Sequence, residues 1–385
     1  MRAAAVYIHV PFCLRKCPYC DFYSVVPRDG WIERYQHALQ KELELRLEQV
    51  EEPIRSVYFG GGTPSLLDPG YVERVLQRLG SLASDCEVTL ECNPSANIRV
   101  EFFASLRAAG VNRLSIGVQS FHDLHLKMLG RLHDASEARW AIRAARRAGF
   151  ENIGIDLIYG IPNQRMSEWV RDLRTAIEEG ACHISTYELT VEDGTPLDTW
   201  IKKGQVRLPD PDRTVEFYLR AHEFLSQAGF EHYEVSNYSL PGFRCRHNER
   251  YWQRMPYLGF GPSAHSFLDS CRLWNARDLH RYCRQLEEGH FPIEGSEELS
   301  NEQELTERVF LSLRTDDGLD LRTLGLSPEL ALRVRAWAKE VGDYLQVDEF
   351  RIRPTVQGML VAEDLAVRLL RYLQDSWAET GSNGR

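Results

Sequence analysis

A strand followed by a helix is the pattern that most constrains this chain, and it repeats through the first 240 of its 385 residues. Short runs rich in β-branched and aromatic residues alternate with long amphipathic stretches. Residues 31–50 form one such stretch, with apolar residues on one face and charged residues elsewhere. The predicted strands are Val6–Val10, Ser56–Phe59, Glu87–Leu90, Arg113–Val118, Asn152–Ile158 and His183–Leu189.

Three of the predicted helices end in an Ala-Gly pair, at Gly110, Gly149 and Gly229. Glycine suits the left-handed position that ends a helix, so these pairs indicate where each helix stops before the next strand. Six strand–helix units in series predict an α/β fold with a parallel sheet. Right-handed crossovers would curl that sheet into a partial, TIM-like (β/α)6 barrel. A doubly wound open sheet is the alternative.

The strand–helix rhythm fades after about residue 235. Residues 1–235 are therefore predicted to form one α/β core domain, and residues 236–385 a smaller, mainly helical C-terminal domain. The second part begins with a segment, 238–267, that is dense in glycine, proline, histidine and aromatic residues. A charged stretch and a helical tail follow it.

Composition excludes several classes of function. The formal net charge of −10 argues against a protein whose main work is binding nucleic acid. No apolar run approaches the roughly 18 residues of a membrane span, and the N-terminus runs directly into the first strand. We therefore expect neither an anchor nor a cleaved signal peptide. Nine cysteines with a single tight cluster are typical of a reducing compartment, which predicts a cytoplasmic protein.

The cysteine cluster is the strongest chemical signal. Cys13, Cys17 and Cys20 form a C-x3-C-x2-C motif directly after the first strand. Thiolates are the soft ligands that iron–sulfur clusters require, and three of them can hold three irons of a [4Fe–4S] cluster while the fourth iron stays open. A structural zinc site is the alternative, but it usually takes four ligands. His9 is the residue that could supply the fourth.

Polar residues stand at or near the carboxyl ends of the successive strands, which is where barrels build their sites. The turn Gly-Gly-Gly-Thr-Pro at 60–64 offers backbone N–H groups to a ligand. Glu91 closes the third strand, where its carboxylate can be a solvated strand-end group or an acceptor for the hydroxyls of a ligand. Asp156 lies in an apolar strand and needs a partner or a function, because burying a bare charge is costly. A structural ion pair with Arg131 is the alternative for this carboxylate.

The cysteine motif after a first strand resembles that of the radical S-adenosylmethionine (SAM) superfamily. The resemblance implies that the open iron binds the methionine part of SAM, and that one electron from the cluster cleaves SAM to methionine and a 5′-deoxyadenosyl radical. The polar pattern is similar to that of one subgroup, the oxygen-independent coproporphyrinogen III oxidases and their relatives. The residues expected to contact SAM are Tyr7, Tyr19, Phe22, Gly61, Gly62, Thr63, Glu91, Gln119, Arg131 and Asp156.

Two features separate the chain from the oxidases of that subgroup. Phe22 stands where the bacterial oxidase has a further cysteine, and the chain begins six residues before Tyr7, without the longer N-terminal extension of the oxidase. Residues 247–252 spell H-N-x-x-Y-W, a motif similar to the mark of the haem chaperones of the same subgroup. This resemblance runs over nearly the whole chain and is strong up to about residue 267.

The chemistry of the H-N-x-x-Y-W motif agrees with haem binding. A neutral imidazole is a common axial ligand of haem iron, so His247 is the predicted iron ligand. Tyr251 and Trp252 offer flat apolar faces to a porphyrin. Guanidinium groups nearby could pair with the haem propionates. These are Arg246, Arg250 and Arg254.

Other interpretations of this segment stay open. It can be a surface loop whose aromatic residues pack on the barrel and whose histidine caps a turn. Cys245 is a rival thiolate ligand for the iron. His265, in Gly-Pro-Ser-Ala-His-Ser, is another candidate ligand, which we rank below His247.

The leading hypothesis is a haem chaperone that binds haem and delivers it to haemoproteins such as respiratory enzymes. The cluster and SAM would support stability, formation of a homodimer or transfer, with an electron donor as a further partner and at most transient contact with a membrane. The alternative is an enzyme of the oxidase class, which would decarboxylate propionate side chains by radical hydrogen abstraction. The chain is an enzyme if the oxidase hypothesis is correct, and the chaperone hypothesis leaves this question open. A third hypothesis, action on tRNA, is disfavoured by the acidic charge.

Overall fold

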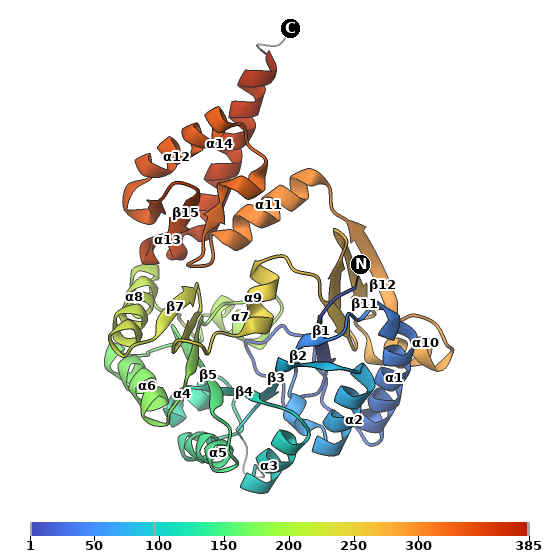
Figure 1. Cartoon of the computed structure of the whole chain (residues 1–385). Coiled ribbons are helices and arrows are strands. Elements are labelled where there is room, and N and C mark those ends of the chain that lie inside the picture. The colour runs from blue at the N-terminus through green and yellow to red at the C-terminus, as the bar shows by residue number, and fades with distance from the viewer. Residues whose placement is uncertain (1, 95–97, 383–385) are drawn as a thin grey trace.

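Six parallel strands lie side by side in the order in which they follow along the chain (Figure 1). Because every crossover moves to the next strand in the same direction, the helices lie outside the sheet, which curls into a partial barrel. A doubly wound sheet would reverse its strand order at a switch point, and this order excludes it. The strands are β1 (Ala5–Val10), β2 (Ile54–Gly61), β3 (Leu82–Cys92), β4 (Arg113–Gln119), β5 (Asn152–Tyr159) and β6 (His183–Glu188).

The computed structural model describes residues 2–94 and 98–382. The predicted helix ends are confirmed, since Gly110, Gly149 and Gly229 have φ angles of 107°, 90° and 87°. The helices of the barrel are α1 (Trp31–Arg46), α2 (Pro69–Leu79), α3 (Val100–Ala108), α4 (Asp123–Met128), α5 (Ala135–Arg147), α6 (Met166–Glu178), α7 (Pro196–Lys202) and α8 (Pro211–Gln227).

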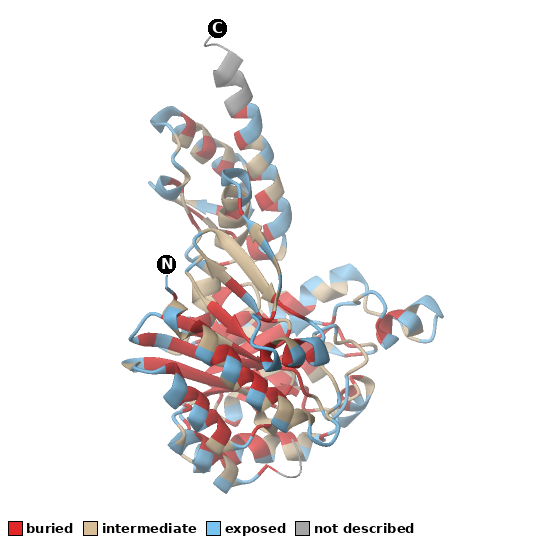
Figure 2. Ribbon diagram, turned by 90° about the vertical axis from the view of Figure 1, so that its right-hand side faces the viewer, coloured by how far each residue is buried: buried red, intermediate tan, exposed pale blue. Residues whose placement is uncertain are grey.

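The main core lies between the sheet and its helices (Figure 2). The strands read as nearly continuous apolar runs because both of their faces are covered. Helix α1 buries Tyr35, Leu39 and Leu43 against the sheet, as its apolar periodicity predicts. The same helix also buries Glu42 and Arg46, which its amphipathic pattern does not predict.

The sheet continues past residue 235. Strands β7 (Glu231–Glu234) and β8 (Asn237–Ser239) extend one edge in antiparallel pairing, and β9 (Leu258–Phe260) extends the other edge parallel to β1. The predicted domain boundary therefore falls between two paired strands. Buried residues from Leu258 to Leu286 also belong to the main core, as does Met359, and the division of the chain at residue 235 stays a prediction.

A small sheet and a separate lobe complete the chain (Figure 1). The lobe has a core of its own within residues 309–373 and is mainly helical, as predicted. Among the described residues, no helix is long and apolar enough to cross a membrane. The remaining elements are α9 (Arg246–Trp252), β10 (His265–Leu268), β11 (Cys271–Asn275), α10 (Leu279–Glu287), β12 (Ile293–Glu298), α11 (Asn301–Ser312), β13 (Leu319–Asp320), α12 (Pro328–Glu340), β14 (Leu345–Val347), β15 (Arg351–Pro354), α13 (Val356–Leu360) and α14 (Ala362–Ser382).

Candidate functional site

A cavity of about 710 Å³ opens at the carboxyl ends of the parallel strands. Its walls come from the cysteine loop between β1 and α1, from β2 to β6, and from side chains of the C-terminal lobe. The cavity brings together the three cysteines and every predicted SAM residue except Tyr7. The predicted residues that line it are Cys13, Cys17, Cys20, Tyr19, Phe22, Gly61, Gly62, Thr63, Glu91, Gln119, Arg131 and Asp156.

Backbone hydrogen bonds shape the cysteine loop. Cys13 N donates to Val25 O at 3.0 Å, and Val25 N donates to Pro11 O at 2.7 Å, so the two ends of the loop are held together. A turn from Cys20 N to Cys17 O, at 3.2 Å, brings the last two cysteines close in space. All three thiols are free and half-buried. In the described part of the chain, no three His, Cys, Asp or Glu side chains converge on a single metal ion.

A chain of hydrogen bonds connects two of these thiols. Arg131 Nη1 donates to Cys17 Sγ at 3.6 Å, and Arg131 Nη2 donates to Asn93 Oδ1 at 2.5 Å. Asn93 Nδ2 then donates to Thr63 Oγ1 at 2.8 Å, and Thr63 Oγ1 donates to Cys13 Sγ at 3.6 Å. Donors and a positive charge beside the sulfur atoms stabilise thiolates, so these residues fit an iron–sulfur cluster on the cysteines.

Glu91 lies at the end of β3 and faces the cavity. Its carboxylate accepts hydrogen bonds from Tyr58 OH at 2.9 Å and from Gly61 N at 3.2 Å. Burial raises its pKa to about 7, and the nearby Asp156 raises it further toward that value. Glu91 is therefore an acceptor whose charge changes near neutral pH, in the position expected for a group that binds ribose hydroxyls.

Asp156 lies on the next strand but one. Ser115 Oγ contacts both carboxylate oxygens at 3.2 Å, and burial raises the pKa of Asp156. Arg131 does not form the structural ion pair that was the alternative interpretation of this carboxylate. Its guanidinium donates instead to Gly117 O at 2.8 Å and to the partners named above. The Asp156 carboxylate thus stays available to a ligand in the cavity.

Gln119 ends β4 in a backbone conformation that side chains rarely adopt, with φ of 70°. Strain of this kind costs about 1–3 kcal/mol and clusters at ligand sites. The buried Gln119 Oε1 has no hydrogen-bond partner among the described residues. An acceptor held in this way toward the cavity fits a ligand with polar hydrogens, such as an adenine amino group.

The glycines at 60–62, at the end of β2, allow a close approach of two parts of the chain. A Cβ at Gly61 would lie 2.6 Å from the ring of His9, and a Cβ at Gly62 would lie 2.5 Å from Phe12 O. These glycines let the turn approach the strand and loop that lead to Cys13. Their first effect is therefore to position the cysteine loop, and contact of their backbone with SAM stays a prediction.

A second cavity, of about 350 Å³, shares Phe22, Gly61 and Glu91 with the first. Tyr7 lines this second cavity, and its OH contacts His9 Nδ1 at 3.2 Å. Tyr7 therefore lies outside the main cavity, but it shares the second cavity with three of the other predicted SAM residues, Phe22, Gly61 and Glu91. Phe22 is 67% exposed and lies between the two cavities, at the position where the sequence suggested a missing cysteine.

His247 lines neither of these cavities, and its role as an iron ligand stays a prediction. Its side chain is buried, Ser56 Oγ contacts Nδ1 at 3.0 Å, and Tyr251 OH contacts Nε2 at 2.8 Å. Its backbone N donates to Glu87 Oε1 at 2.9 Å. Both ring nitrogens are occupied within the barrel, so in this structure His247 fixes α9 to the sheet.

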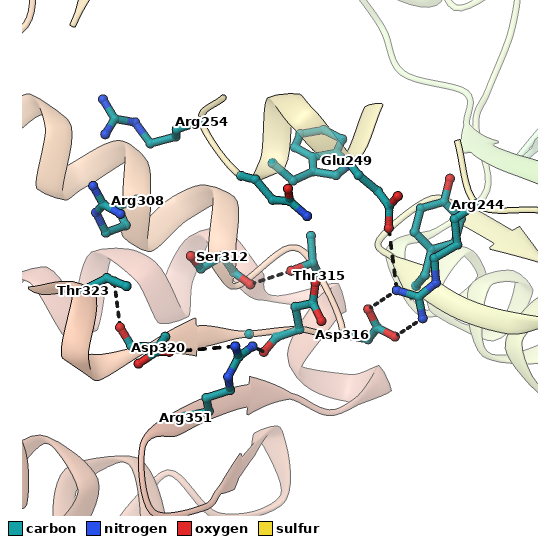
Figure 3. Close-up of a pocket in the computed structure, with 15 residues that line it drawn as sticks. Arg244, Glu249, Arg254, Arg308, Ser312, Thr315, Asp316, Asp320, Thr323 and Arg351 are labelled. Carbon is teal, nitrogen blue, oxygen red and sulfur yellow. Dashed lines mark hydrogen bonds and ion pairs between the residues drawn. The ribbon is translucent and has the colours of Figure 1, made fainter. Parts of the chain in front are cut away.

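The two aromatic residues of the motif point to different places. Tyr251 lines the second cavity, whereas Trp252 lines a third, of about 300 Å³, between α9 and the C-terminal lobe (Figure 3). In this third cavity Arg244 pairs with Asp316 at 2.7 Å and with Glu249 at 3.9 Å. The motif therefore does not form one continuous surface, and Trp252 belongs to the contact with the lobe.

Two of the three predicted haem arginines pair with carboxylates elsewhere. Arg246 pairs with Asp85 at 3.0 Å, and Arg254 pairs with Glu307 at 3.1 Å. The Cys245 thiol is buried, and burial raises its pKa to about 12. A thiol with that pKa is protonated at neutral pH, which disfavours Cys245 as a thiolate ligand.

Sequence reasoning missed several residues of the main cavity. Asn93, Ser115 and Tyr58 contact predicted site residues, and Tyr187 and Arg314 line the cavity. A signal for Ser115 was present, because it alternates with Gly117 and Gln119 along β4 and shares their face. Arg314 gave no such signal, since it comes from the distant lobe.

Comparisons with known proteins agree with this site. The family model of the radical SAM superfamily matches residues 7–176. The protein named heme chaperone HemW of Mycobacterium tuberculosis is 39% identical over 372 residues, 95% of this chain and 94% of that protein. The heme chaperone HemW of Synechocystis sp. is 38% identical over 328 residues, 82% of this chain and 79% of that protein. Coproporphyrinogen III oxidase HemN from Escherichia coli has a similar structure, with a TM-score of 0.81 and 24% identity over 96% of this chain and 91% of that one.

The fold and the cysteine-lined cavity define a protein of the radical SAM class, and the likeness to HemN shows the shared fold. Because relatives of this similarity match the chain over most of its length, the chain belongs to the HemW family within the radical SAM superfamily. The predicted fold class and family are thereby confirmed.

Proposed function

We propose that this protein is a haem chaperone, which binds haem together with a [4Fe–4S] cluster and SAM and delivers the haem to haemoproteins such as respiratory enzymes. The observation that carries the proposal is the family relation, with 39% identity to a named haem chaperone over 95% of the chain. An electron donor, a homodimer, a cytoplasmic location and at most transient membrane contact are parts of the same proposal.

In this proposal Cys13, Cys17 and Cys20 hold the cluster. The reduced cluster would supply the electron that cleaves bound SAM into methionine and a 5′-deoxyadenosyl radical. Support comes from the donors beside two of the thiols, at 3.6 Å in both cases. Glu91 and Gln119 would bind the nucleoside part of SAM, because both present acceptors to the same cavity.

The alternative function is that of an oxidase acting on coproporphyrinogen III, which carries four propionates. Arg15, Lys16 and Arg131 line the cysteine end of the main cavity, but the charge on its opposite wall disfavours this function. The wall formed by the end of β6 and by the C-terminal lobe carries the carboxylates of Glu188, Glu192 and Glu363. Arg314, a cation on that wall, already pairs with Glu363 at 3.7 Å. A substrate with several negative charges would meet repulsion there unless it brought compensating cations.

Haem titration of the anaerobically reconstituted protein tests the proposal. We expect binding of haem and transfer to an apo-haemoprotein, while coproporphyrinogen III with SAM and a reductant is left unchanged. Cys17→Ala is expected to lose the iron–sulfur absorbance and most of its iron and sulfide. Steady formation of protoporphyrinogen would support the alternative. A protein that binds no haem would refute the chaperone function.

A further inference from the structure

Asn93 stands between the two cysteines that receive hydrogen bonds. It follows directly after β3, and it lines the main cavity together with Thr63 and Arg131. The same three residues also line a small neighbouring cavity of about 80 Å³. They therefore form part of the wall between the two cavities, beside Cys17, which both cavities share.

The orientation of the Asn93 amide is fixed by its neighbour Arg131. A guanidinium group has only donors, so the amide atom that it contacts must be the oxygen. Arg131 Nη2 donates to Asn93 Oδ1, and this leaves the amide nitrogen to face Thr63. The same Arg131 nitrogen donates to Gly117 O at 2.8 Å, which holds the guanidinium in this place.

The Asn93 amide in turn decides where the hydroxyl proton of Thr63 lies. Asn93 Nδ2 donates to Thr63 Oγ1 at 2.8 Å, so the hydroxyl oxygen is the acceptor in this contact. A hydroxyl has a single proton, and the other partner of Thr63 Oγ1 among the described residues is Cys13 Sγ at 3.6 Å. The Thr63 proton is therefore directed onto the sulfur atom.

Thr63 does not use its hydroxyl in the way that its position in the chain favours. It is the N-cap of the short 3-10 helix Pro64–Leu66, and a threonine oxygen at an N-cap commonly accepts a hydrogen bond from the backbone of the following turn. In this structure Thr63 makes no such cap hydrogen bond. The hydroxyl contacts the thiol of Cys13 instead, which indicates a role at the cysteine site.

Gly117 on β4 leaves the room that the Asn93 amide needs. A Cβ at this position would lie 2.7 Å from Asn93 Oδ1 and 3.4 Å from Arg131 Nη2. The φ angle of Gly117 is outside the left-handed region, so the backbone conformation does not itself require glycine there. The close approach of these polar groups is therefore the feature that requires a residue without a side chain.

We propose that Asn93 is a positioning residue, which directs the donors of its two neighbours onto the cysteine sulfurs and so sets the reduction potential of the cluster. Arg131 donates to Cys17 at 3.6 Å, and Thr63 donates to Cys13 at the same distance. The inference rests on the [4Fe–4S] cluster of the proposed function and adds a residue that acts on it. Hydrogen bonds to the sulfur atoms of an iron–sulfur cluster offset its negative charge and favour the reduced form.

A double-mutant cycle on Thr63 and Asn93 tests this assignment in the full, anaerobically reconstituted chain. The reduction potential is read by redox titration with electron paramagnetic resonance. Thr63→Val removes the donor and keeps the shape of the side chain. It is therefore expected to shift the one-electron reduction equilibrium about fivefold toward the oxidised cluster.

The effect of Thr63→Val should depend on the residue at position 93. Asn93→Asp still accepts from Arg131 but has no donor, so the Thr63 proton turns toward the new carboxylate. In the Asn93→Asp background, Thr63→Val is expected to shift the equilibrium less than about twofold. The added charge is present in both members of that comparison, so its own effect on the potential cancels. Asn93→Ala gives the same prediction should Asn93→Asp lose the cluster, because it also releases the Thr63 hydroxyl.

Two further variants serve as controls. Thr63→Ser keeps the hydroxyl and is expected to have the potential of the original protein. Thr190→Val is the matched control, because Thr190 lines the same cavity and its hydroxyl contacts Glu192 at 3.2 Å instead of a thiol. Circular dichroism and the content of iron and sulfide show that each variant is folded and holds the cluster.

The outcomes separate this inference from the proposed function. An equal shift from Thr63→Val in both backgrounds, or no shift in the original protein, would overturn the assignment of Asn93 while the proposed function stands. Haem titration is read independently of the potential and decides the chaperone function. A chain that holds no cluster after reconstitution would refute the proposed cofactor and this inference together.

Discussion

Arg131 Nη1 donates a hydrogen bond to Cys17 Sγ at 3.6 Å, which places a permanent positive charge beside a proposed ligand of the cluster. The reduced cluster is more negative than the oxidised one, so a nearby cation stabilises the reduced form. Arg131→Met is therefore expected to lower the reduction potential by roughly 60 mV or more, about tenfold in the one-electron equilibrium. Redox titration followed by electron paramagnetic resonance measures this potential.

Arg165→Met is the matched control for the Arg131 substitution. It removes one arginine with a side chain that is 79% exposed, so the net charge changes equally while the cluster environment does not. We expect its potential to equal that of the original protein. An unchanged potential in Arg131→Met would show that the guanidinium does not act on the cluster.

The raised pKa of Glu91 leads us to expect that SAM binding depends on pH. Burial, followed by the charge of Asp156, raises the pKa of Glu91 to about 7. An ionised carboxylate is a stronger acceptor for ribose hydroxyls than a protonated one. Affinity for SAM is therefore expected to increase about fivefold between pH 6 and pH 8, about 1 kcal/mol. Calorimetric titration measures this, and Glu91→Gln should give a flat profile.

The carboxyl group of Glu91 is expected to lower the free energy of unfolding as the pH rises, whereas it raises the affinity for SAM. A folded protein keeps the Glu91 proton up to about pH 7, whereas the unfolded chain releases it near pH 4.5. The free energy of unfolding of the ligand-free protein should therefore fall as the pH rises from 4.5 to 7, by about 3 kcal/mol. Glu91→Gln should lose this slope and Glu101→Gln, on the exposed side of α3, should keep it. A slope that persists in Glu91→Gln would contradict the assignment.

Much of the barrel could be predicted because local and global signals agree in it. Apolar runs between amphipathic stretches marked all six parallel strands, and the Ala-Gly pairs marked helix ends that the positive φ angles confirm. Residues at the ends of those strands could be placed in one cavity, because parallel strands end at the same face. What could not be predicted is the continuation of the sheet by β8 and β9, whose strands of three residues carry little periodicity.

Residues that act through distant partners were also beyond prediction. Glu42 and Arg46 form an i, i+4 pair that in sequence looks like an exposed surface pair on α1. In the structure both side chains are buried, because Asn275, Gly261 and Tyr282 complete the contacts of Glu42. The sequence pattern contains no information about these partners, which lie more than 200 positions away.

The burial of His247 also depends on distant partners, and it predicts a pH dependence of the free energy of unfolding. Burial, followed by the charges of Arg250 and Arg113, lowers its pKa to about 3. The unfolded chain binds this proton below about pH 6.5, so the folded state loses stability as the pH falls below that value. At pH 5.5 this loss is about 1.4 kcal/mol. His247→Gln cannot titrate and should be free of it.

Urea denaturation at two pH values measures the effect of His247. At pH 7.5 His247→Gln is expected to cost about 1–3 kcal/mol, because buried hydrogen bonds to Ser56 and Tyr251 are perturbed. At pH 5.5 that cost should shrink by about 1.4 kcal/mol. His290→Gln, at a histidine whose side chain is 71% exposed, should be nearly neutral at both values. An equal cost of His247→Gln at both pH values would mean that the folded imidazole accepts a proton.

The buried ion pair of α1 gives the largest expected effect on stability. Glu42 accepts from Arg46 Nη1 at 2.8 Å, and Glu42→Ala would leave that guanidinium buried without its charge partner. Breaking a buried pair in this way costs about 3–5 kcal/mol. Glu44→Ala, two residues away, removes a glutamate that is 54% exposed and paired with Arg78, so about 0–1 kcal/mol is expected. Urea denaturation of the two variants compares them directly. Glu42 also accepts a hydrogen bond from Gly261 N, so equal stability of the two variants would show that the pair does not fasten the segment at Gly261 to the barrel.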